Sequence, residues 1–264
     1  MLIQSTDQTG NTIQIQFPPK RIVSLVPSQT EFILDIGLED EIVGVTRFCI
    51  HPKSKTTGKT KIGGTKNFDV AKIKALNPDL IIGNKEENYV EGITELAKHF
   101  PVWTSDIFTL DDSYAMMHEL GRITDRQAPA EKLIADIRSG FLSYQNEPAK
   151  TNKSCAYFIW RKPYMAAAAN TFIDHMLKTA GFKNVFDAEQ RYPEIKPETL
   201  SELNPDFIFL SSEPYAFSER HYEEFKSLAP NAKVMLVDGE IFSWYGSRLK
   251  LAPAYFTELR KQLG

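Results

Sequence analysis

Aromatic and cationic side chains stand directly after several short hydrophobic stretches of the chain. Trp160 and Arg161 follow one such stretch, and Arg47 follows another. Aromatic rings stack on flat apolar surfaces, and guanidinium groups donate paired hydrogen bonds to anionic groups. The alternative for each aromatic residue is packing in the core or at its rim. These residue types predict a clamp for a bulky, anionic ligand, with the following candidate binding residues: Arg47, Phe48, His51, Lys66, Lys85, Trp160, Arg161, Tyr164, Ser212, Tyr215, Phe242, Trp244 and Arg248.

Cys49 and His51 form a C-x-H pair just before Pro52, which could place a thiolate and an imidazole on one metal ion. Two ligands do not make a metal site, and the other histidines are scattered along the chain. Free cysteine is usually a small core residue. We therefore expect a buried cysteine, a solvent-facing histidine, and neither a bound metal nor a cofactor, with His51 kept as a candidate contact to the ligand.

Enzyme motifs do not support catalysis. The sequence has no G-x-S-x-G elbow, no H-E-x-x-H, and no G-x-G-x-x-G after its first predicted strand. Residues 63–66 (Gly-Gly-Thr-Lys) lack the spacing of a phosphate-binding loop, and a loop close to the ligand is the simpler interpretation. The chain is therefore expected to bind rather than to catalyse.

The elements that would position these residues alternate between strands and helices. A hairpin is expected over residues 2–17, and Ser28 and Glu31 resemble a capping box at the start of the first helix. Such alternation predicts parallel sheets with right-handed crossovers, and ligands bind outside the carboxyl ends of parallel strands. The expected strands are 21–26, 41–46, 79–83, 102–104, 154–160, 206–210 and 233–237, and the expected helices include 69–76, 88–99, 111–123 and 129–144.

A weak internal repeat indicates two related lobes. The run Leu-Asn-Pro-Asp at 76–79, followed by a hydrophobic strand, recurs at 203–206. Between the copies, residues 129–144 carry apolar side chains at helical spacing, and Pro129 suits a first helical turn. We predict an N-terminal α/β lobe (1–125), one long, rigid bridging helix (126–148) and a C-terminal α/β lobe (149–264), with closure of small amplitude.

Composition excludes several classes of protein. The 264 residues, 42% of them hydrophobic and 25% charged, are ordinary for a folded globular chain. The 31 basic and 34 acidic residues give a net charge of −3, and no long run of lysine or arginine suggests nucleic acid as a partner. No apolar stretch approaches the length of about 18 residues needed to cross a membrane.

The predicted lobes carry a specific family resemblance. Residues 21–31 (RIVSLVPSQTE), 42–46 (IVGVT) and 73–82 (IKALNPDLII) resemble the helical-backbone metal receptors. These are the substrate-binding proteins of ABC importers for cobalamin, haem and ferric siderophores, and the vitamin B12-binding members look most similar. The resemblance extends from about residue 13 to the C-terminus, and it implies two chelatase-like α/β lobes joined by one long helix.

The resemblance also implies roles for particular residues. It implies that the ligand lies in the cleft between the lobes, which residues 48–52 and 160–164 would line, with Phe242 to Trp244 near a cleft aromatic. It implies that acidic surface residues of both lobes engage arginines of a membrane permease. Glu198 matches the second-lobe docking residue. The matching first-lobe position holds Ala71, so Asp69 is the substitute candidate.

The preferred hypothesis is therefore a monomeric ABC-importer binding protein that captures a metal chelate and delivers it to a permease. Two alternatives remain open: an intracellular chelate carrier without a permease, and a chelatase-like enzyme acting on tetrapyrroles. The polar start of the chain shows no signal peptide, so the compartment is periplasmic or membrane-surface by resemblance and cytoplasmic as the alternative. The residues leave open whether cobalamin, haem, a catecholate or a hydroxamate is bound.

Overall fold

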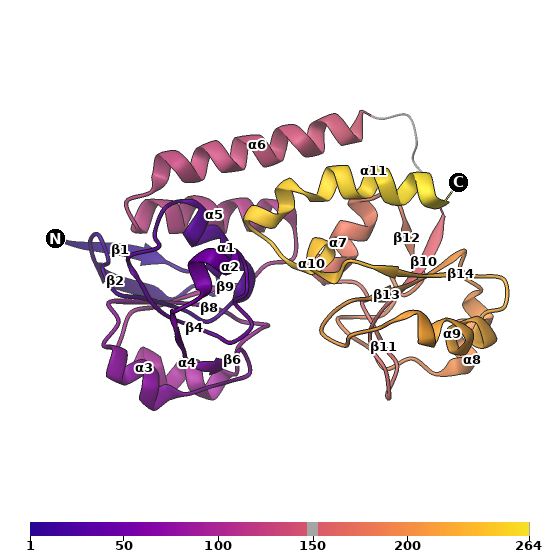
Figure 1. Cartoon of the computed structure of the whole chain (residues 1–264), viewed down its shortest axis with the longest axis horizontal. Coiled ribbons are helices and arrows are strands. Elements are labelled where there is room, and N and C mark those ends of the chain that lie inside the picture. Colours follow the sequence, from indigo (N-terminus) through magenta and orange to yellow (C-terminus); the bar gives the residue numbers. More distant parts are fainter. Residues whose placement is uncertain (147–152, 264) are drawn as a thin grey trace. The chain divides into compact units, whose positions relative to one another are not determined.

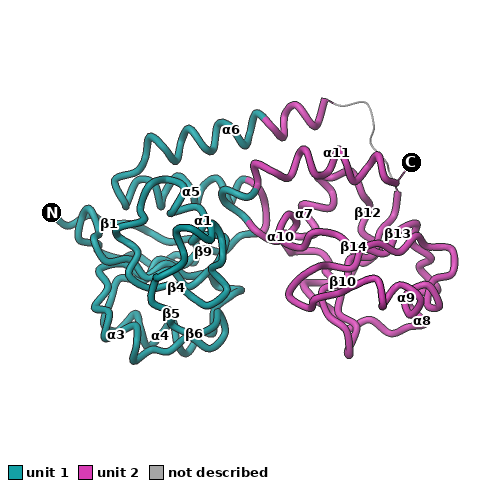
Figure 2. Tube along the Cα trace, viewed as in Figure 1, with its two compact units in different colours: residues 1–107, 111–139, 245–248 teal, residues 108–110, 140–244, 249–264 magenta. Residues whose placement is uncertain are grey.

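A computed structural model describes residues 1–146 and 153–263 of the chain. It divides into two compact units, each with its own sheet and helices (Figures 1 and 2). Unit 1 comprises residues 1–107, 111–139 and 245–248, and unit 2 comprises 108–110, 140–244 and 249–264. Both units are α/β with parallel pairing, which confirms the predicted fold class.

Unit 1 is built on a five-stranded parallel sheet, with helices on both sides (Figure 1). Its three central strands, which begin at residues 22, 42 and 80, are short and mainly aliphatic, as expected for strands buried on both faces. Their order is β5 (Thr60–Lys61), β4 (Ile42–Val45), β3 (Ile22–Ser24), β8 (Leu80–Asn84) and β9 (Val102–Ser105). Two antiparallel hairpins accompany the sheet: β1 (Leu2–Thr6) with β2 (Thr12–Gln16), and β6 (Gly63–Gly64) with β7 (Asn67–Phe68).

Four of the five helices around this sheet were predicted within a few residues, and the short helix at 53–56 was not predicted. They are α1 (Pro27–Asp35), α2 (Lys53–Thr56), α3 (Val70–Leu76), α4 (Val90–Ala97) and α5 (Leu110–Ile123). The capping box predicted for the first helix is wrong, because α1 begins at Pro27, one residue before Ser28. Proline at the first helical position has a preset φ and lacks an N–H that would need a cap. Its N-cap residue, Val26, makes no side-chain cap.

Unit 2 is built on strands of the same kind with one antiparallel addition. The order is β11 (Met165–Ala166), β10 (Ser154–Trp160), β13 (Phe207–Ser211) and β14 (Lys233–Val237), and β12 (Lys183–Asn184) pairs with the start of β10. Only β11 pairs antiparallel among these described strands. The helices are α7 (Phe172–Thr179), α8 (Pro197–Leu203), α9 (Tyr222–Leu228), α10 (Gly239–Ser243) and α11 (Ala252–Leu263), with a 3₁₀ turn at Glu219–His221. A second 3₁₀ turn, Ser247–Lys250, begins in unit 1 and ends in unit 2.

The helix expected to connect the lobes is α6 (Gln127–Gln145), which contributes residues to both units. The predicted segment 126–148 extends to two positions, 147 and 148, that lie outside the described residues. The compact units also differ from continuous lobes in two short segments: residues 108–110 group with unit 2, and residues 245–248 group with unit 1.

The repeated Leu-Asn-Pro-Asp run has the same conformation in both units. Asn77 ends α3 and Asn204 ends α8, each with a left-handed backbone at φ 44° and φ 42°. The proline that follows prevents the helix from continuing. The aspartate of each copy then binds the chain at the start of a neighbouring strand: Asp79 accepts backbone N–H bonds from Lys20 and Arg21, and Asp206 accepts from Ser154.

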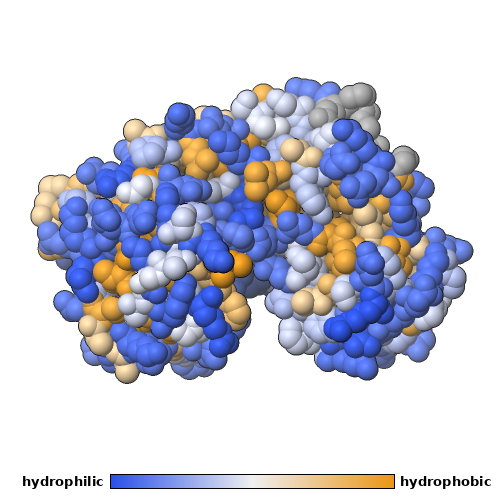
Figure 3. All heavy atoms as spheres, in the orientation of Figure 1, coloured by the Kyte–Doolittle hydropathy of each residue, from blue (hydrophilic) through white to orange (hydrophobic). Residues whose placement is uncertain are grey.

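Polar and charged residues cover most of the face shown in Figure 3, with hydrophobic residues in small groups. Among the described residues, no helix has both the length and the apolar composition needed to cross a membrane.

Candidate functional site

The carboxyl ends of the parallel strands in unit 1 carry several predicted binding residues. Arg47 and Phe48 follow β4, and Lys85 follows β8. The Phe48 ring is 48% exposed, and the Arg47 guanidinium lies over it, 4.9 Å from the ring centroid. A cation held over an aromatic face gives a surface that is both apolar and polar. This part of unit 1 therefore has the composition predicted for a binding surface.

Gly64 leaves room for this arrangement. A Cβ at position 64 would lie 3.2 Å from the Phe48 ring and 3.4 Å from an Arg47 nitrogen. The same hairpin carries Lys66, whose ammonium donates to the backbone carbonyl of Glu86. The segment that was predicted as a loop close to the ligand is thus a two-stranded hairpin beside Phe48.

Arg248 is in unit 1, where it pairs with Glu31 of α1. Its Nε and Nη2 donate to the two carboxylate oxygens of Glu31 at 3.0 and 2.8 Å, and the two side chains are only 11% and 14% exposed. Burial raises the pKa of Glu31, although the bonds from Arg248 oppose this rise. His51, half-buried, also acts on Glu31 and lowers its pKa. The guanidinium predicted to meet an anionic ligand is therefore already engaged by a carboxylate.

In unit 2, Trp160 is the last residue of β10, with 40% of its surface exposed. Tyr215 packs edge-on against it, with ring centroids 5.6 Å apart. Ser212 is exposed after β13, and its hydroxyl accepts a bond from the Gly239 backbone N–H at 2.9 Å. The strand ends of unit 2 thus present an aromatic pair with a polar rim.

Arg161 pairs with a carboxylate in the same unit. Its Nε lies 2.9 and 3.0 Å from the two oxygens of Glu224, which also accepts a bond from the Tyr164 hydroxyl at 2.5 Å. Burial raises the pKa of Glu224, but the bonds from Arg161 and Tyr164 outweigh it and hold this pKa below its ordinary value. The carboxylate therefore stays charged and fixes both predicted binding residues.

Two predicted aromatic contacts are largely buried in unit 2. Phe242 has no exposed surface and packs against Tyr157 and Phe256. Trp244 is 7% exposed, and its Nε1 donates to Glu213 at 2.7 Å. Position after a strand predicted a binding role, but the Phe242 ring of α10 is fully buried, whereas the Trp244 indole bonds to Glu213 just after β13.

Sequence reasoning missed the carboxylates that hold the cations. Glu31 and Glu224 lie 217 and 63 positions from their arginine partners, so no local motif could reveal the pairs. A third carboxylate, Glu213, is half-buried and accepts bonds from the Ser243 hydroxyl and from Trp244. Burial raises its pKa.

Cys49 is a core residue, because its side chain has no exposed surface. Its sulfur lies 3.0 and 3.1 Å from the hydroxyls of Thr30 and Thr46, and burial raises the pKa of the thiol. Across residues 1–146 and 153–263, no group of three histidine, cysteine, aspartate or glutamate side chains is placed to hold a metal ion.

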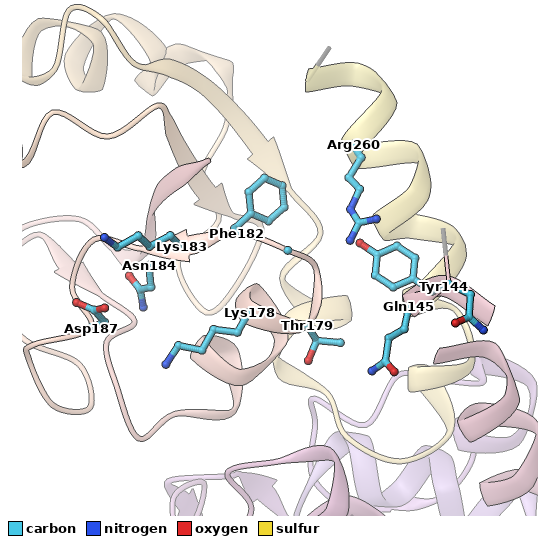
Figure 4. Close-up of a pocket in the computed structure, with 11 residues that line it drawn as sticks. Tyr144, Gln145, Lys178, Thr179, Phe182, Lys183, Asn184, Asp187 and Arg260 are labelled. Carbon is cyan, nitrogen blue, oxygen red and sulfur yellow. The ribbon is translucent and has the colours of Figure 1, made fainter. Parts of the chain in front are cut away.

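Two cavities lie away from these strand ends. One of about 650 Å³ in unit 2 lies beside β12, at the amino end of β10. Figure 4 shows Arg260 of α11 beside the ring of Tyr144; the guanidinium lies 4.1 Å from the ring centroid, and its Nε donates to the Ala180 carbonyl. The second cavity, of about 560 Å³ in unit 1, is lined by Trp103, Tyr114 and Arg138 among others.

The predicted docking residues lie at equivalent places in the two units. Glu198 is exposed in the first turn of α8. Ala71 precedes Asn77 in the sequence by as many residues as Glu198 precedes Asn204, and each asparagine ends its helix. Asp69 is exposed and caps α3 by accepting a bond from the Lys72 N–H at 3.0 Å. The structure therefore supports the alignment of these positions, and docking itself remains a prediction.

Comparison with known proteins gives consistent results. Residues 22–232 match the family model described as periplasmic binding protein. An uncharacterised ABC transporter substrate-binding lipoprotein of Bacillus subtilis is 28% identical over 76% of this chain and 67% of its own length. A vitamin B12-binding protein of Pectobacterium carotovorum is 25% identical over 89% and 86%.

The fold has close counterparts among solved structures. A periplasmic vitamin B12-binding protein of Vibrio cholerae matches 94% of this chain and 99% of its own with a TM-score of 0.78, at 22% identity. The chain therefore belongs to the periplasmic binding protein family, in the group of helical-backbone metal receptors that its sequence resembles.

Proposed function

We propose that this protein is the substrate-binding component of an ABC importer and captures a metal chelate of the cobalamin, ferric-siderophore or haem kind. The strand-end residues of the two units would bind the chelate, and a permease would receive it. Family membership and the B12-binding relative support this proposal. The metal would be cargo inside the chelate rather than a resident cofactor. Proteins of this family bind and release ligand, and neither motifs nor relatives support catalysis.

One observation carries the proposal most directly. Large rings are exposed at the carboxyl ends of the strands in both units: Phe48 after β4 and Trp160 at the end of β10. A large apolar side chain that stays in water forgoes the favourable free energy of burial. Exposed rings are therefore typical of surfaces that bind a partner or ligand. Rings stack on the extended faces of macrocycles and chelates, which accounts for their position at this edge.

Calorimetric titration of the protein with cyanocobalamin, haemin and several ferric siderophores tests the proposal. We expect one class to bind with a micromolar or lower Kd, equivalent to about −8 kcal/mol or stronger. Trp160→Ala and Phe48→Ala should each weaken binding at least tenfold. Leu203→Ala is the matched control, because Leu203 is 41% exposed but ends α8, away from the strand carboxyl ends. Unchanged affinity in both ring variants would contradict the proposed surface.

Delivery to a permease needs a separate experiment. Glu198→Lys places a cation where an acidic docking residue is proposed, while Glu202→Lys changes a residue in the last turn of the same helix. We expect Glu198→Lys to reduce chelate uptake by cells with normal chelate affinity, and Glu202→Lys to have a smaller effect. Asp69→Lys tests the first-unit position in the same way. Normal uptake with both Glu198→Lys and Asp69→Lys would argue against docking through these residues and favour a periplasmic or membrane-surface carrier of another kind.

A further inference from the structure

The cations predicted to attract an anionic ligand are already paired within their own units. Arg248 binds Glu31 through two hydrogen bonds, and Arg161 lies within 3.0 Å of both oxygens of Glu224. Lys85 pairs with Asp106, with 2.6 Å between the ammonium nitrogen and the carboxylate oxygen. A cation that is paired with a carboxylate attracts a further anion only weakly, because the two charges largely cancel. Breaking a buried pair to bind the anion would leave the carboxylate unpaired.

The other strand-end cations also have local contacts. Arg47 stacks on Phe48, and Lys66 donates to the backbone carbonyl of Glu86, whose own carboxylate belongs to the same stretch. The backbone stretch that Lys66 contacts therefore carries two carboxylates, those of Glu86 and Glu87.

Carboxylates accompany the basic residues at the strand ends of both units. In unit 1, Arg47, Lys66, Lys85 and Arg248 are accompanied by Glu31, Glu86, Glu87 and Asp106. In unit 2, Arg161 and Lys162 are accompanied by Glu213, Glu224, Asp238 and Glu240. Sites that bind polyanions normally present an excess of positive charge, which raises the local concentration of the ligand. The pairing of Arg248, Lys85 and Arg161 with carboxylates reduces any such excess in both units.

From this balance we propose that the chelate carries no net negative charge. The inference rests on the proposed function, and it replaces the anionic ligand that the cations alone predicted. Binding would come from stacking on Phe48 and Trp160 and from hydrogen bonds to paired polar groups. A neutral corrinoid or a neutral ferric trihydroxamate has this chemistry. A ferric tris-catecholate, with three negative charges, does not.

Equilibrium dialysis with cyanocobalamin, a neutral ferric trihydroxamate, haemin and a ferric tris-catecholate tests the inference. The salt concentration is held at 150 mM, where the Debye length is about 8 Å, so that distant charges are screened equally for every chelate. We expect at least one neutral chelate to bind at least 100-fold more tightly than the tris-catecholate and haemin. Tighter binding of either anionic chelate would overturn the charge inference and leave the proposed function standing. Binding of no chelate would overturn both.

Variants that release the paired cations sharpen the test. Glu224→Gln frees Arg161 in unit 2, and Asp106→Asn frees Lys85 in unit 1, each by a change that keeps the shape of the side chain. Each should raise the ratio of tris-catecholate affinity to neutral-chelate affinity by about tenfold. Glu119→Gln removes the partner of Arg122 in α5 and is the matched control, with no change in the ratio expected. An unchanged ratio in both release variants would show that the pairs do not set ligand charge.

Discussion

Each unit has an aspartate that connects the end of one helix to the start of a neighbouring strand, but the hydrogen-bond donors to this aspartate differ between the units. In unit 1, Asp79 accepts two backbone N–H bonds, at 2.7 Å from Lys20 and 2.8 Å from Arg21. In unit 2, Asp206 accepts one backbone N–H and one hydroxyl bond from Ser154 and an ammonium bond from Lys153. The carboxylate occurs at the same step of the fold in each unit, while its partners differ. The topology therefore requires an acceptor at this point and tolerates several donors.

Their cores differ as well. The central strands of unit 1 are aliphatic, as in β8, whereas β10 and β13 of unit 2 contribute Tyr157, Phe158 and Phe209. Phe158 lies in a cluster of rings, 4.8 Å from Phe225 and 6.2 Å from Phe186 by centroid. Similar sheets can thus be filled by branched chains or by interlocking rings, provided that the total volume is preserved.

The largest expected effect tests this difference between the cores. Phe158→Ala should destabilise the protein by about 3–5 kcal/mol, because it removes a whole ring from a dense cluster. Ile81→Ala, at a fully buried position of β8, should cost about 2–4 kcal/mol. Urea unfolding followed by circular dichroism measures both. A smaller loss for Phe158→Ala than for Ile81→Ala would contradict the importance given to the ring cluster.

The next effect concerns the two aspartates. Asp206→Ala removes an ammonium bond and two part-buried bonds from Ser154 and should cost about 2–3 kcal/mol, while Asp79→Ala, which removes two exposed backbone bonds, should cost about 1–2 kcal/mol. Asp79→Asn, which keeps one acceptor oxygen, should give an intermediate loss. The free energy of unfolding in urea provides the comparison. Equal losses in the two alanine variants would mean that the difference in donors has no energetic consequence.

A smaller effect is expected at the left-handed asparagines. Asn77→Ala should cost about 1 kcal/mol, since alanine disfavours a positive φ, whereas Asn77→Gly should change stability by only a few tenths of a kcal/mol. Asn204→Ala should cost slightly more, because the Asn204 side chain also accepts a bond from Asn231. Thermal unfolding of the variants in parallel distinguishes these values. An alanine variant as stable as its glycine counterpart would contradict the conformational explanation.

The smallest effect is electrostatic and belongs to Asp206. The hydrogen bond from Lys153, followed by the backbone bond from Ser154, lowers the pKa of Asp206 below its ordinary value of 3.8. The folded state therefore gains stability from the charged form above about pH 4, and it loses this gain as the pH falls through the lower folded pKa. Lys153→Met should move the pKa of Asp206 upward in a carboxyl NMR titration. No movement would assign the shift to Ser154 instead.

Much of the fold could be predicted because its signals are local. The strands 154–160 and 233–237 begin and end where hydrophobic alternation and turn residues placed them, and the other predicted strands differ from the structure by one or two residues at their ends. Helix ends at Asn77 and Asn204 were also readable, since an asparagine before a proline stops a helix. The start of α1 was misread because Ser28 and Glu31 match a cap motif while Pro27 already begins the helix.

The candidate site was predictable only in part. Exposure of Trp160 and Phe48 follows from their place at strand ends, which the sequence indicates. The partners of Arg161 and Arg248 depend on long-range packing, and short motifs contain no information about it. The burial of Phe242 has the same origin, because α10 turns after Asp238 and directs its ring into the core. Charge balance at a binding surface is therefore a property of the folded chain rather than of any segment.

The return of residues 245–248 to unit 1 has a consequence for how the protein can be made and divided. These residues supply Arg248 to Glu31, and the backbone N–H of Gly246 donates to the Ser113 hydroxyl at 3.2 Å. A fragment covering only residues 1–139 would leave the mostly buried Glu31 carboxylate without its guanidinium. During synthesis, the ion pair between Arg248 and Glu31 of unit 1 likewise cannot form until most of unit 2 has been made, because Arg248 follows residues 140–244 in the chain.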